Sequence, residues 1–251
     1  MSEPERGKLV ELVGRSNRFW APCRLRRSAK AKRVSVRMLA GGEVELVIPL
    51  RHSEQEAFAF LQGQGEWIER RLACSVAPVA LLEYLRKKPH LTIDGQIRPI
   101  IFSFGNSKGR PSWRRSDDTG VEFTLDPAQD PERQMIPLAN DLAKSYLPVR
   151  VARWGKRFGL SPKSVRVGNQ RSRWGSCSSQ GVLSLNWRLL LLEPNLHDYV
   201  ICHELAHLKI MNHSTNYWSY LSKMNPKATE LDRELNKISR QLMSVGRTTT
   251  R

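Results

Sequence analysis

The sequence has no uninterrupted apolar run near the ~20 residues that a membrane-spanning helix needs, so we expect no membrane segment. Its beginning, M-S-E-P-E-R-G-K, lacks the apolar core of a secretory signal. The four cysteines have no C-x-x-C spacing, which argues against a zinc ribbon, and they are too scattered in 251 residues to suggest a disulfide framework. Internal repeats and a P-loop are also missing. Together these absences predict a cytoplasmic protein.

Acidic residues are scarce: 24 Asp and Glu stand against 41 Lys and Arg, which gives a formal net charge of +17 at pH 7. Such a surplus concentrates polyanions, so a nucleotide or a nucleic acid could bind the basic surface. Ordinary solubility charge explains the surplus equally well. Basic residues crowd between Arg24 and Arg37, where they could grip phosphate or protect an edge strand from aggregation. Composition leaves the oligomeric state open.

One stretch does carry chemistry: residues 200–213 read V-I-C-H-E-L-A-H-L-K-I-M-N-H. His203 and His207 are four residues apart, so on a helix they share one face and both imidazoles can reach one zinc ion. Glu204 sits beside the first histidine and is placed to take a proton from a water that the metal activates. The bland alternative is a polar face of a surface helix.

The flanking residues predict the helix that this motif requires. Pro194 suits a first helical turn, because its missing N–H is no loss there. An apolar stripe recurs at helical spacing, at Leu196, Val200, Leu208 and Met211. Asn212 is expected to end the helix in the left-handed conformation, and Ser214 to cap a next helix from Thr215 to about Met224.

Such a stop lets His213 turn back as a third ligand, which leaves one zinc position open for water. Glu230 and Glu234 are alternative third ligands, although glutamates in a later helix more often form a solvated face. His197 lies in the first helical turn, off the ligand face, and is expected to be exposed.

The first half of the chain predicts strands and hairpins. We expect a loosely ordered N-terminus over residues 1–23 and a β-rich region over 24–128. That region should contain a hairpin turning at Gly41-Gly42, a helix from a Ser53/Glu56 capping box to about Cys74, and a hairpin turning at Asp94-Gly95. Residues 105–119 are polar and predict a loop.

The second half predicts a separate domain over residues 129–245, followed by a disordered tail over 246–251. A long helical pattern starts at Pro131 and should stop at Gly159, with a kink at Pro148. Short strands near Val165 and over 182–186 precede the motif helix, and two amphipathic helices follow it. The predicted class is α+β.

Three sequence blocks surround the motif: R-W-G-S-C at 173–177, N-W-R-L at 186–189, and N-H-S at 212–214 after H-E-L-A-H. In this order and spacing they resemble the YgjP-like metallopeptidases, within the wider SprT-like group of zincins, over about 24–237. The resemblance implies a minimal zincin fold of a backing helix, a small sheet and the metal helix. It also implies that the three histidines bind zinc and that Glu204 is the catalytic base. After N-H-S the chain departs from the family pattern, with Thr215 and Tyr217 in place of proline and phenylalanine.

The main functional hypothesis is a zinc peptidase that cleaves a peptide or protein substrate. The strand over 182–186 is expected to pair with the extended substrate. Arg173 and Tyr217 are candidate donors to the developing oxyanion, with packing roles as alternatives. A second hypothesis is a zinc hydrolase of phosphoanhydrides such as nucleoside triphosphates. A third is a nucleic-acid-associated module with a structural metal, or a protease recruited to DNA.

Overall fold

A computed structural model describes residues 8–15, 17–39, 42–73, 77–105, 110–116 and 120–247. The chain forms two compact units, residues 1–78 with 247–251 and residues 79–246. Each unit has its own hydrophobic core and combines helices with small mixed sheets, so the predicted α+β class is confirmed. The boundary predicted between residues 128 and 129 falls inside the second unit, because the strands before it share a core with the helices after it. None of the described helices is long and apolar enough to cross a membrane.

The first unit is a four-stranded sheet in the order β1-β2-β4-β3. Its elements are β1 (Lys8–Val13), β2 (Arg18–Ser28), β3 (Ser35–Met38), β4 (Val44–Pro49), α1 (Glu54–Gln62) and α2 (Gly65–Ala73). Strands β2 and β4 are parallel, and the other neighbours are antiparallel, including the predicted β3–β4 hairpin. Part of its predicted turn, Gly41, lies outside the described residues. The sequence predicts a loosely ordered segment where β1 and the first half of β2 lie. These strands are ordered because Leu12, Ala21 and Cys23 pack into the core.

The single helix predicted from Ser53 to Cys74 is wrong, because two helices occupy this segment. Helix α1 ends at Gln62, and Gly65 begins α2. The backbone of Val13 approaches Gly65 closely. A Cβ on residue 65 would clash with the carbonyl oxygen of Val13, so only glycine fits at this position. Ser53 is the N-cap of α1, but its side chain makes no capping hydrogen bond, so the predicted capping box is also wrong. Cys74 lies outside the described residues.

The second unit contains two sheets, ordered β5-β6-β8-β7 and β10-β11-β9. Its elements are α3 (Leu81–Lys87), β5 (His90–Ile93), β6 (Gln96–Phe104), β7 (Ser112–Ser116), β8 (Gly120–Leu125), α4 (Pro131–Phe158), β9 (Ser164–Gly168), β10 (Gly175–Cys177), β11 (Val182–Asn186), the 3-10 helix η2 (Trp187–Leu191), α5 (Pro194–Ala206), α6 (Thr215–Met224) and α7 (Ala228–Ser244). The β5–β6 hairpin is confirmed. The loop predicted over 105–119 is wrong, because it contains β7.

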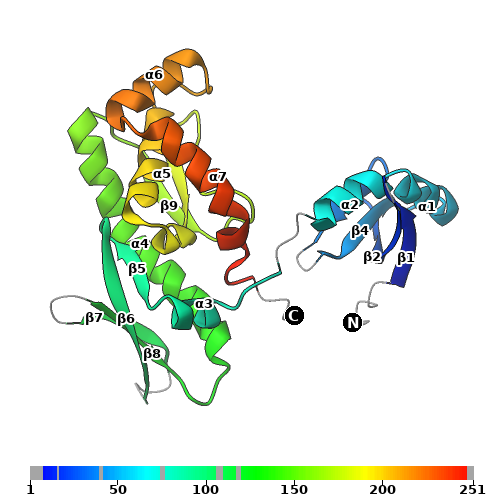
Figure 1. The fold of residues 1–251 in the computed structure, drawn as a ribbon, viewed down its shortest axis with the longest axis horizontal. Coiled ribbons are helices and arrows are strands. Elements are labelled where there is room, and N and C mark those ends of the chain that lie inside the picture. The colour runs from blue at the N-terminus through cyan, green and yellow to red at the C-terminus, as the bar shows by residue number, and fades with distance from the viewer. Residues whose placement is uncertain are drawn as a thin grey trace. The chain divides into compact units, whose positions relative to one another are not determined.

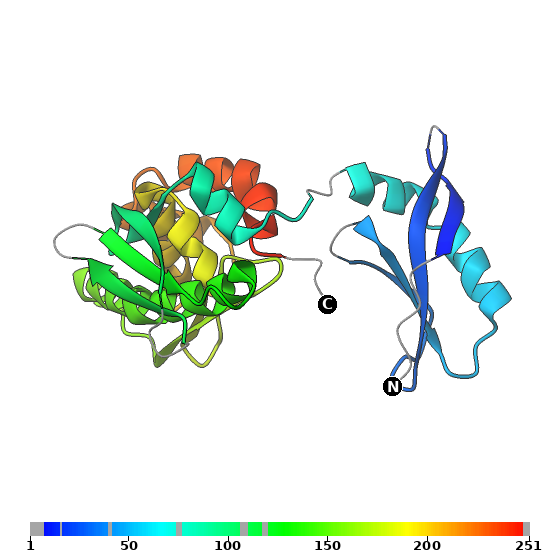
Figure 2. The same cartoon turned by 90° about the horizontal axis from the view of Figure 1, so that it is seen from below.

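Helix α4 is the structural support of this unit (Figure 1). It runs unbroken for 28 residues although Pro137 and Pro148 lie inside it, and it ends at Gly159 in the left-handed conformation, as predicted. It contacts β7 and β8 of one sheet, β9 of the other, and α5. Helices α5 and α7 also lie side by side, in yellow and red in Figure 2. The helix of the sequence motif is therefore packed between a backing helix and the C-terminal helix.

The motif helix ends earlier than expected. Helix α5 stops at Ala206, and the next residues turn with hydrogen bonds from Leu208 N to Leu205 O and from Ile210 N to Ala206 O. The predicted stop at Asn212 is therefore wrong, and among the described non-glycine residues only Asp94 has a positive φ. Met211 is 52% exposed, so the prediction that it belongs to the apolar stripe of the motif helix is wrong.

Candidate metal centre

Three histidines meet at the end of α5. His203, His207 and His213 each offer one nitrogen, and these atoms all lie within 4.8 Å of one another. The shortest separation joins His203 Nε2 and His213 Nε2, at 3.1 Å. Bonds of ~2.1 Å in a tetrahedral zinc site would separate two ligand nitrogens by about 3.4 Å, so the spacing is close to what one cation requires.

The early end of α5 explains how the third histidine returns. His207 is the last, C-cap residue of the helix, and its Nδ1 lies 3.0 Å from the carbonyl oxygen of Ile210 in the turn that follows. The chain then reverses, and α6 begins two residues after His213. Tyr217 in the first turn of α6 packs its ring on His207, with centroids 4.6 Å apart and a 22° interplanar angle. The turn and α6 together bring His213 against the two helical histidines.

Two of these imidazoles are kept neutral by their surroundings. Burial, together with the neighbouring His207 and His213, lowers the pKa of His203 to about 3. Burial also lowers the pKa of His207. A neutral imidazole has one nitrogen lone pair free for a metal, so His203 and His207 have the protonation state that metal binding needs.

The hydrogen bonds fix which nitrogen is free. Tyr199, one helical turn before His203, places its hydroxyl oxygen 3.4 Å from His203 Nδ1 and donates to Asp232 Oδ1 at 2.8 Å. The second carboxylate oxygen of Asp232 accepts from Asn236 at 3.0 Å. With the Nδ1 proton of His203 directed at Tyr199, the lone pair of its Nε2 points at His213. His207 directs its Nδ1 proton at the carbonyl oxygen of Ile210, so its Nε2 also carries a free lone pair, and the residues present fit a metal ion.

Glu204 is buried, with 5% of the residue exposed. Burial raises the pKa of its carboxyl to about 8, although the positive charge of Arg173 lowers that pKa in part. Strand β10 passes directly over it: a Cβ on Gly175 would lie 2.6 Å from Glu204 Cγ and Oε1. Glycine at position 175 therefore makes room for this carboxylate.

The N-W-R-L block holds the strand that faces Glu204. Asn186 donates its side-chain N–H groups to the carbonyl oxygens of Gln170 and Arg173, at 2.9 and 3.0 Å, and its Oδ1 accepts from Arg188 N. Trp174 donates its ring N–H to Ser239 of α7 at 2.8 Å. These bonds fix the loop before β10 from both ends, which explains why the two sequence blocks occur together.

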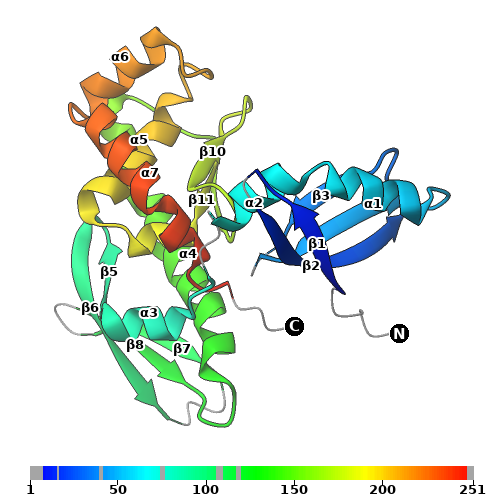
Figure 3. The ribbon, with the colours of Figure 1, turned by 45° about the vertical axis from the view of Figure 1, so that its right-hand side comes forward.

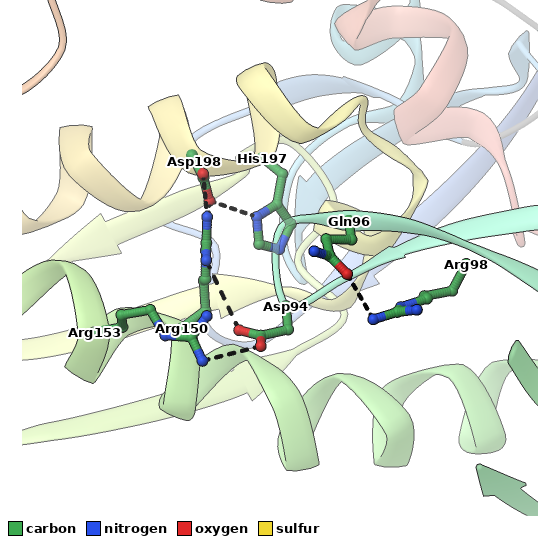
Figure 4. Close-up of polar contacts among 7 residues, drawn as sticks. All are labelled: Asp94, Gln96, Arg98, Arg150, Arg153, His197 and Asp198. Carbon is green, nitrogen blue, oxygen red and sulfur yellow. Dashed lines mark hydrogen bonds and ion pairs between the residues drawn. The ribbon is translucent and has the colours of Figure 1, made fainter. Parts of the chain in front are cut away.

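The base of α5 is anchored on the backing helix (Figure 4). Arg150 of α4 donates from Nε and Nη2 to both carboxylate oxygens of Asp198, and it also pairs with Asp94 at 3.8 Å. His197 Nδ1 lies 3.2 Å from Asp198 Oδ1. The expectation that His197 is exposed is wrong, because it is 1% exposed and packs beside this ion pair. The network fixes the start of the helix that carries the histidines.

The remaining candidates lie in different surroundings. Tyr217 is fully buried and its hydroxyl donates to the backbone oxygen of His203 at 3.0 Å, so this donor is already engaged. Arg173 is exposed in the loop before β10. Glu230 and Glu234 are exposed on α7 and do not belong to the histidine cluster found among the described residues.

The substrate-pairing role predicted for the strand over 182–186 is wrong for that strand. Strand β11 pairs with β10 on one side and β9 on the other, so it has no free edge. Strands β10 and β9 are the two edges of this sheet, and β10 is the one that passes over Glu204.

Sequence reasoning missed the residues that orient the site. Tyr199 could have been found, since it lies four residues before His203 and therefore on the same helix face. Asp232 could not, because it comes from α7 and only the packing of that helix on α5 brings it near. Asn186 was quoted as part of a block, but its role depends on a loop conformation that the sequence does not reveal.

One comparison with known proteins identifies the family. A family model described as the YgjP-like metallopeptidase domain matches residues 32–238. Among solved structures, the chain is similar to the metallopeptidase zymogen of Pyrococcus abyssi abylysin, with 29% identity over 36% of this chain and 92% of that chain, and a TM-score of 0.32. No curated protein matches. Since the family model covers far more than half of the residues, the chain belongs to the YgjP-like metallopeptidases and is a metal-dependent peptidase.

Proposed function

We propose that this protein is a zinc peptidase in which His203, His207 and His213 hold the metal and Glu204 is the general base. The observation that carries the proposal is the convergence of three ligand nitrogens within 4.8 Å beside a buried carboxylate. The ligand set supports zinc in particular, because three neutral imidazoles with one position left open are typical of catalytic zinc. Family membership supports cleavage of a peptide bond.

The bound metal would supply a Lewis acid that polarises the substrate carbonyl and acidifies a water. Glu204 accepts the proton of that water and passes it to the leaving amine. Burial raises the pKa of Glu204, whereas a dication held by the three histidines would lower it again and favour the ionised form that a general base needs. Tyr217 positions His203 and His207 through its hydrogen bond and its stacked ring.

Substrate binding is assigned to β10 and to Arg173. The outer edge of β10 can pair with an extended peptide, which would lie along Gly175 and Cys177 close to Glu204. Arg173 precedes this strand, and its exposed guanidinium is near enough to Glu204 to affect the pKa of that carboxyl. It is therefore the candidate donor to the developing oxyanion.

The test compares Glu204→Gln with Glu230→Gln, which makes the same change on the exposed face of α7. Both variants and the wild type are incubated with zinc and either casein or nucleoside triphosphates. We expect casein cleavage to fall at least about a hundredfold in Glu204→Gln alone, with zinc content unchanged. Phosphate release that depends on Glu204 would instead support a phosphoanhydride hydrolase. Casein cleavage that survives in Glu204→Gln would contradict the proposed role of this residue.

A further inference from the structure

The sheet of the first unit has one face without helices. Buried residues of β1, β2 and β4 pack with Ala57 and Leu61 of α1 and Ile68 of α2, so both helices cover the same face (Figure 3). Alternation along the strands turns the other residues to the opposite face. On this helix-free face lie Leu9, Glu11, Val13, Arg18, Trp20, Pro22, Arg24, Arg26, Ser35, Arg37, Glu45 and Val47.

The helix-free face is positive and its cations are all arginines. No acidic residue occurs between Glu11 and Glu43 in the sequence. Glu45 is buried between Arg24 and Arg26, at 3.0 and 3.2 Å, and thereby holds the two guanidiniums in place. Arg18 and Arg37 are exposed at other points of the face. Planar guanidinium groups contact phosphate oxygens in pairs and also stack on rings.

The same face exposes a tryptophan. Trp20 is 63% exposed and lies within the chain segment that lacks acidic residues. An exposed indole on a pleated sheet is a stacking platform for an unpaired base, and arginines beside it can follow the phosphates of a single strand. A duplex would offer this ring no free base face.

Two other partners fit less well. An acidic peptide would engage the arginines and leave the exposed ring unexplained. A membrane would have to accept Glu11, which lies directly opposite Trp20 between Leu9 and Val13. Strands β1 and β2 both precede residue 32, where the family match begins, so half of the strands of this face lie outside the matched region.

We propose that the helix-free face of the β1-β2-β4-β3 sheet binds single-stranded nucleic acid, with Trp20 stacking on a base and Arg18, Arg24, Arg26 and Arg37 contacting phosphates. The surface is independent of the metal centre, so the proposal stands or falls without the proposed peptidase chemistry.

The test measures binding of the full chain to a fluorescent oligothymidylate by anisotropy, across a range of salt concentrations. Trp20→Ala should weaken binding about tenfold or more, and Trp20→Phe should recover part of the loss. The double variant Arg18→Gln with Arg37→Gln should reduce the slope of log affinity against log salt by about 1.4, at ~0.7 per lost contact. The matched control is Arg70→Gln with Arg71→Gln, the same charge change on exposed residues of α2.

Three outcomes would overturn the proposal. The first is no binding of the oligothymidylate by the wild type at low salt. The second is an equal effect of the two double variants, which would indicate general charge attraction. The third is stronger binding to the same strand annealed to its complement, to polyglutamate or to anionic vesicles. Circular dichroism of each variant checks that the exposed substitutions leave the fold intact.

Discussion

The metal centre and the helix-free face of the first unit both gather polar and aromatic side chains, but they hold them in opposite ways. At the metal centre the side chains are held by hydrogen bonds to other parts of the unit: Tyr199 to Asp232, Tyr217 to His203, and Asn186 to the loop before β10. On the helix-free face, Glu45 contacts two arginines, Arg18 forms an exposed ion pair with Glu11 at 3.8 Å, and Trp20 extends into solvent. We therefore expect a change of a single atom to impair the metal centre. Binding at the helix-free face should instead depend on its total charge and on the area of the exposed ring.

The sharpest test of the metal centre adds one methyl group there and, as a comparison, one in the first unit. Gly175→Ala should lower peptidase activity about a hundredfold or more, because the new Cβ would push Glu204 out of place and small displacements of a catalytic group are costly. A Cβ in Gly14→Ala also meets a carboxylate, that of Glu69 on α2. This carboxylate accepts a hydrogen bond from Arg15 N in an exposed position, so it can swing into water.

Activity on casein is the measurement, with folding checked by circular dichroism. Gly14→Ala should stay within about twofold of the wild type, since its clash is with the far end of a flexible side chain. Equal losses in the two variants would remove the distinction between a preorganised and a tolerant region.

A smaller effect is expected from a single hydroxyl. Tyr199→Phe should weaken metal binding about 10- to 100-fold, because His203 loses the partner that orients its Nδ1 proton. Tyr220→Phe removes the same atom from a half-exposed tyrosine of α6 and should leave metal affinity unchanged. Chelator competition measures both. Wild-type affinity in Tyr199→Phe would show that Tyr199 is merely packed there.

The smallest effect concerns the anchor of α5 at acidic pH. Burial alone would raise the pKa of Asp198, but hydrogen bonds from His197 and Arg150 lower it from 3.8 to about 2. A lowered pKa means that the ionised form stabilises the fold: the contribution is complete above about pH 4 and disappears as the pH falls to about 2. It amounts to about 2 kcal/mol, at ~1.4 kcal/mol per pKa unit.

Asp198→Asn should therefore destabilise the metal-free protein at pH 6 and make little difference near pH 2. Urea unfolding at both pH values measures this. The control, Glu83→Gln, removes a carboxylate from the exposed Lys87 pair and should change the unfolding midpoint little at either pH. A pH-independent effect of Asp198→Asn would show that shape rather than charge anchors the helix.

Much of the second unit could be predicted from local patterns. The spacing of His203 and His207 requires one helix face, the left-handed Gly159 ends α4 as expected, and the predicted fold class and family are confirmed. What failed depended on distant contacts. The end of α5 is set by a tight turn and not by Asn212, and His197 is buried because Arg150 of another helix pairs with its neighbour. The sequence predicts a loop at β7 because the adjacent polar residues Arg114 and Arg115 interrupt the alternation typical of a strand.

X-ray absorption at the zinc edge of the full chain tests most directly whether His203, His207 and His213 bind one metal ion. We expect one zinc per chain with three imidazole nitrogens at about 2.0–2.1 Å and one further light ligand. His213→Ala should lose one imidazole from that shell. A spectrum unchanged in His213→Ala, or one with sulfur bound to the zinc, would contradict the three-histidine centre.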